Sequence, residues 1–145
     1  MSEFKRMSLI KPNINTPFHL DFEWWKEMDR NWRVDLRGLL CDEHREALSL
    51  FPEDQKIDWV DPETAEVKPM DGLQYMITSH CAHQEEFLTE HTTMVDAVFR
   101  TFLANGNMPM SPDEFSKYLG RPADLILKTL GGPRVYKGIR PLIQQ

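Results

Sequence analysis

The apolar positions of the chain repeat most regularly between residues 94 and 103. Six apolar side chains recur there at intervals of three and four residues: Met94, Val95, Val98, Phe99, Phe102 and Leu103. This spacing places them on one face of an α-helix, with the polar positions on the other face. The helix is expected to begin after Thr92 or Thr93 and to end at Asn105–Asn107, where a glycine can adopt a left-handed conformation.

Two shorter helices and a strand are expected after this helix. Ser111 is followed three positions later by Glu114, which is the sequence of a capping box, and a proline occupies the first helical position between them. The pattern predicts a short helix that ends at Gly120 and a third helix within residues 121–130. Residues 134–140 then alternate between polar and apolar side chains, which is typical of a β-strand.

The N-terminal half carries a longer amphipathic pattern. Apolar residues recur at helical spacing from residue 21 to residue 48 and predict one helix of about six turns, with a potential break near Gly38. Residues 57–60 and 65–67 flank a turn sequence and predict a short β-hairpin. Another helix is expected between residues 71 and 81, because its apolar side chains again share one helical face.

These elements predict a mainly α protein with a minor β component. A length of 145 residues suits one domain or two small ones. We expect an extended or disordered arm at residues 1–20 and a helical, acidic region with a short hairpin at residues 21–90. A C-terminal unit of three helices and a strand is expected at residues 91–145.

The order of elements in this C-terminal unit resembles the winged helix-turn-helix superfamily. The segment Met110–Pro122 is similar to the stretch in which many bacterial regulators of this superfamily complete the second helix, turn at a Leu-Gly step and begin the third helix. The resemblance covers roughly the last third of the chain. It implies that the third helix and the wing contact DNA through Arg121, Asp124, Lys128, Thr129, Arg134, Tyr136, Lys137 and Arg140.

The charge distribution is compatible with a polyanionic partner. The chain has a formal net charge of −6, yet seven basic and four acidic residues lie from Met94 onward, so the acidic excess belongs to the preceding residues. The sequence therefore predicts a small DNA-binding regulator. The third helix, however, carries the apolar run Leu125–Leu127 and few side chains that read bases.

The alternative function is a protein-interaction or assembly module built on the same fold. The acidic N-terminal half would then bind a protein partner, because winged helices are not restricted to nucleic acid. Three tryptophans at helical spacing, Trp24, Trp25 and Trp32, are expected in the core or at the contact of a homodimer.

Cysteine and histidine residues gather at two places in the sequence. Cys41 and His44 lie three positions apart on an expected helix, and Cys81 lies between His80 and His83. Zinc binds four nitrogen or sulfur ligands, often supplied as two close pairs. A structural zinc site is therefore predicted from Cys41, His44, Cys81 and His83, with His80 as the alternative to His83. The other interpretation treats both cysteines as small buried apolar residues.

The remaining sequence features exclude several classes of protein. No apolar run approaches the ~20 residues of a membrane span, and the N-terminus does not have the pattern of a signal peptide. Two cysteines do not form a disulfide scaffold, so we expect a cytoplasmic protein with reduced thiols. The sequence offers no phosphate-binding loop and no evident nucleophile with its base, and we therefore expect that the protein is not an enzyme.

Overall fold

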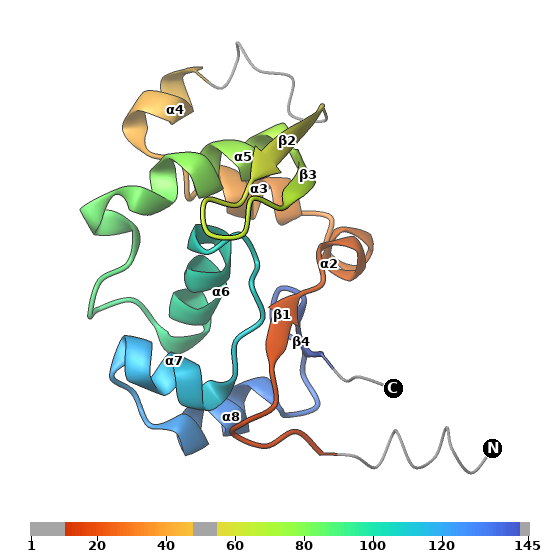
Figure 1. Ribbon diagram of the computed structural model, residues 1–145, viewed down its shortest axis with the longest axis vertical. Helices are drawn as coiled ribbons and strands as arrows, with labels where there is room; N and C mark the ends of the chain where they lie inside the picture. The colour runs from red at the N-terminus through yellow and green to blue at the C-terminus, as the bar shows by residue number, and fades with distance from the viewer. Residues whose placement is uncertain (1–10, 48–54, 143–145) are drawn as a thin grey trace, which may run out of the picture.

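The helix α6 (Met94–Ala104) lies at the centre of the fold. The computed structural model describes residues 11–47 and 55–142 of the chain. The predicted apolar face of α6 is buried, with Val98, Phe99 and Phe102 at most 1% exposed. Figure 1 shows α5 and the β2–β3 hairpin at one end of α6, and α7 and α8 at the other. This helix therefore connects the two halves of the molecule.

The helices α7 (Pro112–Leu119) and α8 (Ala123–Leu130) confirm the prediction for this region. Ser111 and Glu114 form a capping box, because the Ser111 hydroxyl accepts from the Glu114 N–H at 3.2 Å and the Ser111 N–H donates to the Glu114 carboxylate at 3.1 Å. Gly120 adopts the left-handed conformation expected at the end of α7, with φ of 70°. The two helices bury Phe115 and Ile126 against α6.

The prediction of one long helix from residue 21 to residue 48 is wrong. Three short helices occupy its described part: α2 (Phe22–Met28), α3 (Trp32–Arg37) and α4 (Asp42–Ala47). The first break is at Asp29, whose backbone is extended and whose carboxylate accepts hydrogen bonds from the Trp25 indole at 3.2 Å and the Asn31 N–H at 2.9 Å. An aspartate that bonds to nearby groups in this way competes with the helix for the backbone. The second break is at Gly38, where a break was expected.

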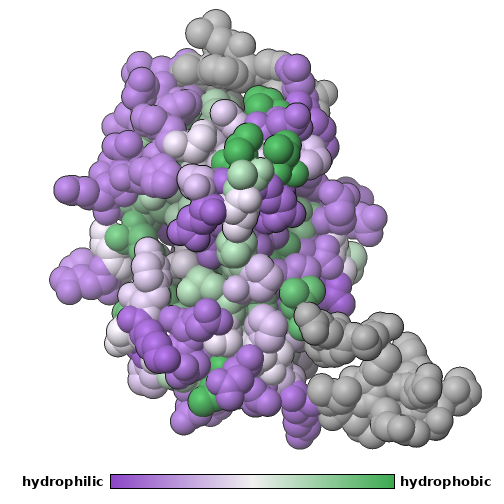
Figure 2. Space-filling model, viewed as in Figure 1, coloured by the Kyte–Doolittle hydropathy of each residue, from purple (hydrophilic) through white to green (hydrophobic). Residues whose placement is uncertain are grey.

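The predicted β-hairpin is present, although its second strand begins two residues later than expected and extends to Asp71. The strands β2 (Lys56–Val60) and β3 (Val67–Asp71) pair antiparallel, and α5 (Gly72–Ser79) follows directly. Polar side chains cover most of the face in Figure 2, and small groups of hydrophobic side chains interrupt them over the hairpin. Val60 and Val67, which are cross-strand partners, are both more than half exposed. Two short 3₁₀ helices, Cys81–His83 and Glu85–Phe87, then lead toward α6.

A second small sheet joins the two ends of the described chain. The strand β1 (Phe18–Leu20) pairs antiparallel with β4 (Ile139–Pro141), and Phe18 also exchanges two backbone hydrogen bonds with Met110. The predicted N-terminal arm thus ends in a strand that lies between Met110 and β4. Residues 1–10 of that arm lie outside the described part of the chain.

The strand predicted at residues 134–140 is shorter than expected. Lys137 and Gly138 both have positive φ, and the Ile139 N–H donates to the Tyr136 carbonyl at 2.8 Å. Two consecutive residues with positive φ are typical of a type I′ turn. This turn reverses the chain before β4, so the regular strand begins only at Ile139.

One continuous hydrophobic core runs through the described residues. It includes side chains from β1, α2, α5, α6, α7 and α8, among them Phe18, Trp25, Leu73, Phe115 and Ile126. The core therefore crosses the boundaries expected at residues 20 and 90, and the division into separate domains stays a prediction. The chain is mainly α-helical with two small antiparallel sheets, as expected.

Candidate functional site

Four side chains from two distant segments form a cluster of metal-binding type. Cys41 lies immediately before α4 and His44 in its first turn, whereas His80 and Cys81 follow the end of α5. One ligand atom from each residue lies within 4.8 Å of every other. The structure therefore brings together two sulfur and two nitrogen atoms that could hold a metal ion.

Cys41 is the centre of this cluster. Its sulfur lies 3.3 Å from Nδ1 of His44, 3.4 Å from Nδ1 of His80 and 3.5 Å from the Cys81 sulfur. The zinc–sulfur and zinc–nitrogen bond lengths place the ligands of a tetrahedral site about 3.3–3.8 Å apart. The three contacts of Cys41 fall in this range, so the four side chains need only small movements to coordinate one ion.

The local structure explains how Cys41 and His44 on one side, and Cys81 on the other, are held in position. The Arg45 N–H donates to the Cys41 carbonyl at 2.8 Å, which is the first hydrogen bond of α4 and puts Cys41 and His44 on one face of the helix. Cys81 is 1% exposed and belongs to the hydrophobic core, so its position is fixed by packing. One half of the cluster is therefore anchored in the core, and the other is carried by a short surface helix.

The carboxylate of Glu43 lies beside the ring of His80, one of the four side chains of the cluster. It is 3.6 Å from Nε2 of His80, whose other ring nitrogen faces the Cys41 sulfur. A metal-bound histidine typically shares its second nitrogen with a carboxylate, which fixes the orientation of the ring. Sequence reasoning did not include Glu43, although its position between Cys41 and His44 is a signal that could have identified it.

Burial controls the protonation of the Cys81 thiol. Burial raises the pKa of the Cys81 thiol to about 11, and a hydrogen bond from the Cys41 backbone partly opposes that rise. Without a cation the Cys81 side chain is therefore a protonated thiol at neutral pH. A bound divalent cation favours the thiolate and reverses this preference.

His83 does not belong to the cluster, and the alternative His80 takes its position. Cys81 and His83 lie two residues apart in a 3₁₀ helix, in which such residues point to different sides because a turn contains about three residues. His83 is exposed and lines a separate cavity with Trp59 and Tyr75. The spacing alone did not distinguish the two histidines.

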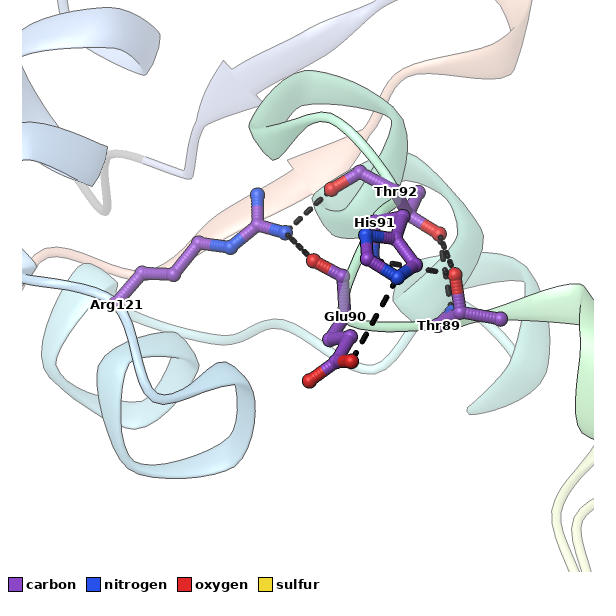
Figure 3. Close-up of polar contacts among 5 residues, drawn as sticks. All are labelled: Thr89, Glu90, His91, Thr92 and Arg121. Atoms are coloured by element: carbon purple, nitrogen blue, oxygen red, sulfur yellow. Dashed lines mark hydrogen bonds and ion pairs between the residues drawn. The ribbon is translucent and has the colours of Figure 1, made fainter.

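The predicted DNA contact Arg121 is bonded to the protein itself. Its guanidinium donates to the Thr92 carbonyl and, at 3.4 Å, to the Glu90 carbonyl (Figure 3). The same loop is held by Thr89, whose N–H donates to the Thr92 hydroxyl at 3.0 Å. Arg121 therefore connects the turn between α7 and α8 to the loop that precedes α6.

Two further predicted DNA contacts also have partners in the protein. The Lys137 ammonium lies 3.2 Å from the Asp96 carboxylate and over the ring of Phe99. The Arg140 guanidinium lies 3.2 Å from the Asp21 carboxylate. Both cations are thus used to hold the turn and β4 against α6 and the start of α2.

The other predicted DNA contacts lie on α8 and in the segment before β4. Asp124 and Lys128 are exposed on α8, and the hydroxyl of Thr129 donates to the Leu125 carbonyl at 2.9 Å. Arg134 is exposed, with its guanidinium over the ring of Tyr136. The eight residues therefore differ in their exposure and in the partners that they have within the protein. Lys128, Arg134 and Arg140 are the exposed cations among these residues, and Arg140 is paired with Asp21.

In residues 11–47 and 55–142, no helix combines the length and the apolar character needed to cross a membrane. We compared the chain with protein-family models, with curated proteins and with solved structures, and none of the three comparisons gave a match.

Proposed function

We propose that Cys41, His44, His80 and Cys81 bind one zinc ion with a structural role, and that the protein is a binding module without catalytic activity. The observation that carries this proposal is the cluster of two sulfur and two nitrogen atoms around Cys41. Four protein ligands complete a tetrahedral zinc sphere, whereas catalytic zinc keeps one position for water or substrate. The carboxylate of Glu43 beside His80 supports the same assignment.

The zinc ion would attach α4 to the rest of the fold. This helix has six residues, and Asp42, Glu43, Arg45 and Glu46 are all exposed. A helix of this length is unstable on its own, because ordering the backbone of the first turn loses more conformational entropy than its few hydrogen bonds can offset. Bonds from Cys41 and His44 to an ion shared with the core residue Cys81 would supply the missing tertiary contact.

The test is the metal content of the purified protein and its variants. We expect one zinc per chain by elemental analysis, and loss of that zinc in Cys41→Ser, His80→Asn and Cys81→Ser. The matched control is His83→Asn, which changes a histidine close in sequence but outside the cluster and should retain the zinc. Equal zinc content in all four variants, or its absence from the unmodified protein under reducing conditions, would disprove the proposal.

We further propose that residues 91–145 form a winged helix-turn-helix whose exposed helices bind a protein. The sequence of α6, α7, a left-handed glycine turn, α8 and β4 supports this architecture. Tyr118 on α7 and Leu125 on α8 are 62% and 48% exposed, and such side chains are suited to a partner with an apolar surface. DNA binding is less well supported, because three of the predicted DNA contacts, Arg121, Lys137 and Arg140, already have partners within the protein.

Duplex DNA provides the decisive comparison between the two kinds of partner. Fluorescence anisotropy at ~50 mM salt should detect any binding based on phosphate contacts, because the electrostatic term is strongest there. We expect no binding by the unmodified protein. Binding that is lost in a Lys128→Glu, Arg134→Glu double variant, but kept in Tyr118→Ser, would establish the DNA-binding function instead.

A further inference from the structure

The two cysteines of the chain are in contact with each other. Their sulfur atoms lie 3.5 Å apart, and neither is part of a disulfide. The sequence contains no other cysteine, so each is the only intramolecular partner that the other can have. The pair joins the start of α4 to the segment after α5, which is the same connection that the proposed zinc site makes.

We propose that Cys41 and Cys81 are a site of oxidative modification: a peroxide converts the metal-free pair into an intramolecular disulfide, which excludes zinc. The protection of the pair by zinc rests on the proposed metal site. The formation of the disulfide in the metal-free protein does not, because it needs only the contact between the two sulfur atoms.

The reaction has two balanced steps. The Cys41 sulfur attacks one oxygen of hydrogen peroxide, the O–O bond breaks, and Cys41 becomes a sulfenic acid while one water leaves. The Cys81 sulfur then attacks the Cys41 sulfur, the S–O bond breaks, and the hydroxyl group leaves as a second water with the proton of the Cys81 thiol. The two thiols together lose two electrons, and the peroxide gains them.

The surroundings of the pair make Cys41 the first residue to react. Cys41 is half-buried, whereas Cys81 is 1% exposed, so the oxidant reaches Cys41 more easily. A cavity of about 250 Å³ borders both cysteines and is partly open to solvent. The cavity is lined by Arg45 and Arg100 together with the acidic side chains of Asp42 and Glu86.

The bond requires little rearrangement of the fold. A disulfide has a sulfur–sulfur distance of about 2.05 Å, so the two atoms must approach by about 1.5 Å from their present separation. Cys81 is held in the core, but Cys41 precedes a short helix whose described side chains are mostly exposed. We therefore expect Cys41, and not Cys81, to move when the bond forms.

The oxidised and zinc-bound states exclude each other. Zinc is bound by thiolates, and a disulfide sulfur has lost the negative charge that makes it a ligand. Oxidation would consequently leave only His44 and His80 for the metal. The same pair of side chains would then hold α4 in place by a covalent bond under oxidising conditions and by a metal ion under reducing conditions.

The experiment uses the full chain, stripped of metal under reducing conditions and then treated with hydrogen peroxide. Mass spectrometry of the intact chain should show the loss of two hydrogen atoms, and proteolysis should yield one peptide pair joined through Cys41 and Cys81. Dithiothreitol should restore the original mass. Cys41→Ser and Cys81→Ser are the matched controls, and neither can form the intramolecular bond.

The rate of disulfide formation tests whether the folded chain already holds the two thiols close together. We expect disulfide formation to be at least about tenfold faster in native buffer than in urea, because the fold raises the effective concentration of one thiol at the other. Equal rates in buffer and urea would disprove the proposal. So would a product made mainly of intermolecular dimers or of sulfinic acid on single cysteines.

A second arm treats the protein with one equivalent of zinc before peroxide is added. Zinc should slow the reaction by at least about tenfold, since both sulfur atoms are then coordinated. A disulfide that forms rapidly with or without zinc, in a chain that also lacks zinc by elemental analysis, would reject the zinc site and keep the disulfide. Zinc binding without a disulfide in the stripped protein would reject the disulfide and keep the zinc site.

Discussion

The backbone N–H of Asp21 donates a 2.8 Å hydrogen bond to the carbonyl oxygen of Gly138. This bond joins the start of α2 to the tight turn before β4, although the two residues lie near opposite ends of the chain. The turn is therefore fixed to the rest of the fold. It is packed against α2, and the side chain of Trp25 lies beside it.

A side chain at Gly138 should disrupt this packing. A Cβ atom there would lie 2.8 Å from the Asp21 carbonyl oxygen and 2.9 Å from Cβ of Trp25, and the φ of 78° is unfavourable for other residues. We expect Gly138→Ala to lower the free energy of unfolding by about 2–4 kcal/mol. Urea denaturation monitored by tryptophan fluorescence measures this change.

Gly120→Ala is the matched control for that substitution. Gly120 has a similar φ of 70°, but a Cβ atom there would meet nothing within 4 Å. The expected loss is therefore the conformational strain alone, about 1 kcal/mol. If the two variants were equally stable, close packing of Gly138 against α2 would not be a determinant of stability.

Arg121 should contribute to stability more than to binding. Its guanidinium donates to the carbonyl groups of Thr92 and Glu90, and Arg121→Ala leaves these acceptors without this donor. We expect a loss of about 1–2 kcal/mol in the free energy of unfolding. Lys128→Ala on the exposed side of α8 should change stability by less than about 0.5 kcal/mol. The prediction fails if thermal or urea denaturation gives the same value for both variants.

His19 should make stability depend on pH. Burial lowers its pKa below the usual value of 6.5, the nearby Arg140 acts in the same direction, and Asp21 partly opposes both. The unfolded chain then binds a proton at a higher pH than the folded chain does. Stability should therefore fall as the pH decreases below about 6.5, and this loss is complete once the pH is below the folded pKa.

The variant His19→Gln isolates this contribution from other titrating groups. We expect the stability difference between the two proteins to shift in favour of the glutamine variant between pH 7.5 and pH 5. Urea denaturation at several pH values provides the measurement. Parallel pH profiles for the two proteins would show that His19 does not couple to folding.

Zinc binding should release protons and should weaken as the pH falls. The pKa of the Cys81 thiol is about 11, so this residue must lose a proton before it coordinates zinc at neutral pH. Calorimetric titrations in two buffers with different ionisation enthalpies should show release of at least about one proton per zinc at pH 7. Binding without proton release would contradict the assignment of Cys81 as a thiolate ligand.

Local sequence signals predicted the helices around the centre of the fold. Ser111, Glu114 and Gly120 define both ends of α7 through contacts within a few residues, so no knowledge of the tertiary structure was needed. The periodic apolar face of α6 was sufficient for the same reason. The break at Asp29 was missed because an apolar pattern says nothing about a carboxylate that bonds to the indole of Trp25.

The candidate metal centre was only partly predictable. Cys41 and His44 lie at helical spacing, which is a local signal, and Cys81 was the natural partner as the second cysteine. The choice of His80 over His83 depends on how the chain turns after α5, which is determined by packing. The internal bonds of Arg121, Lys137 and Arg140 likewise depend on contacts between distant segments and were not evident from their charge.

The placement of β1 affects the order in which the protein can fold. Phe18 is bonded on one side to Met110 and on the other side is paired with Pro141, so β1 cannot complete its pairing until residues 139–141 have been synthesised. Contacts between such distant residues carry a large loop-closure entropy and slow folding. We therefore expect α6 to α8 to form before β1 pairs with β4.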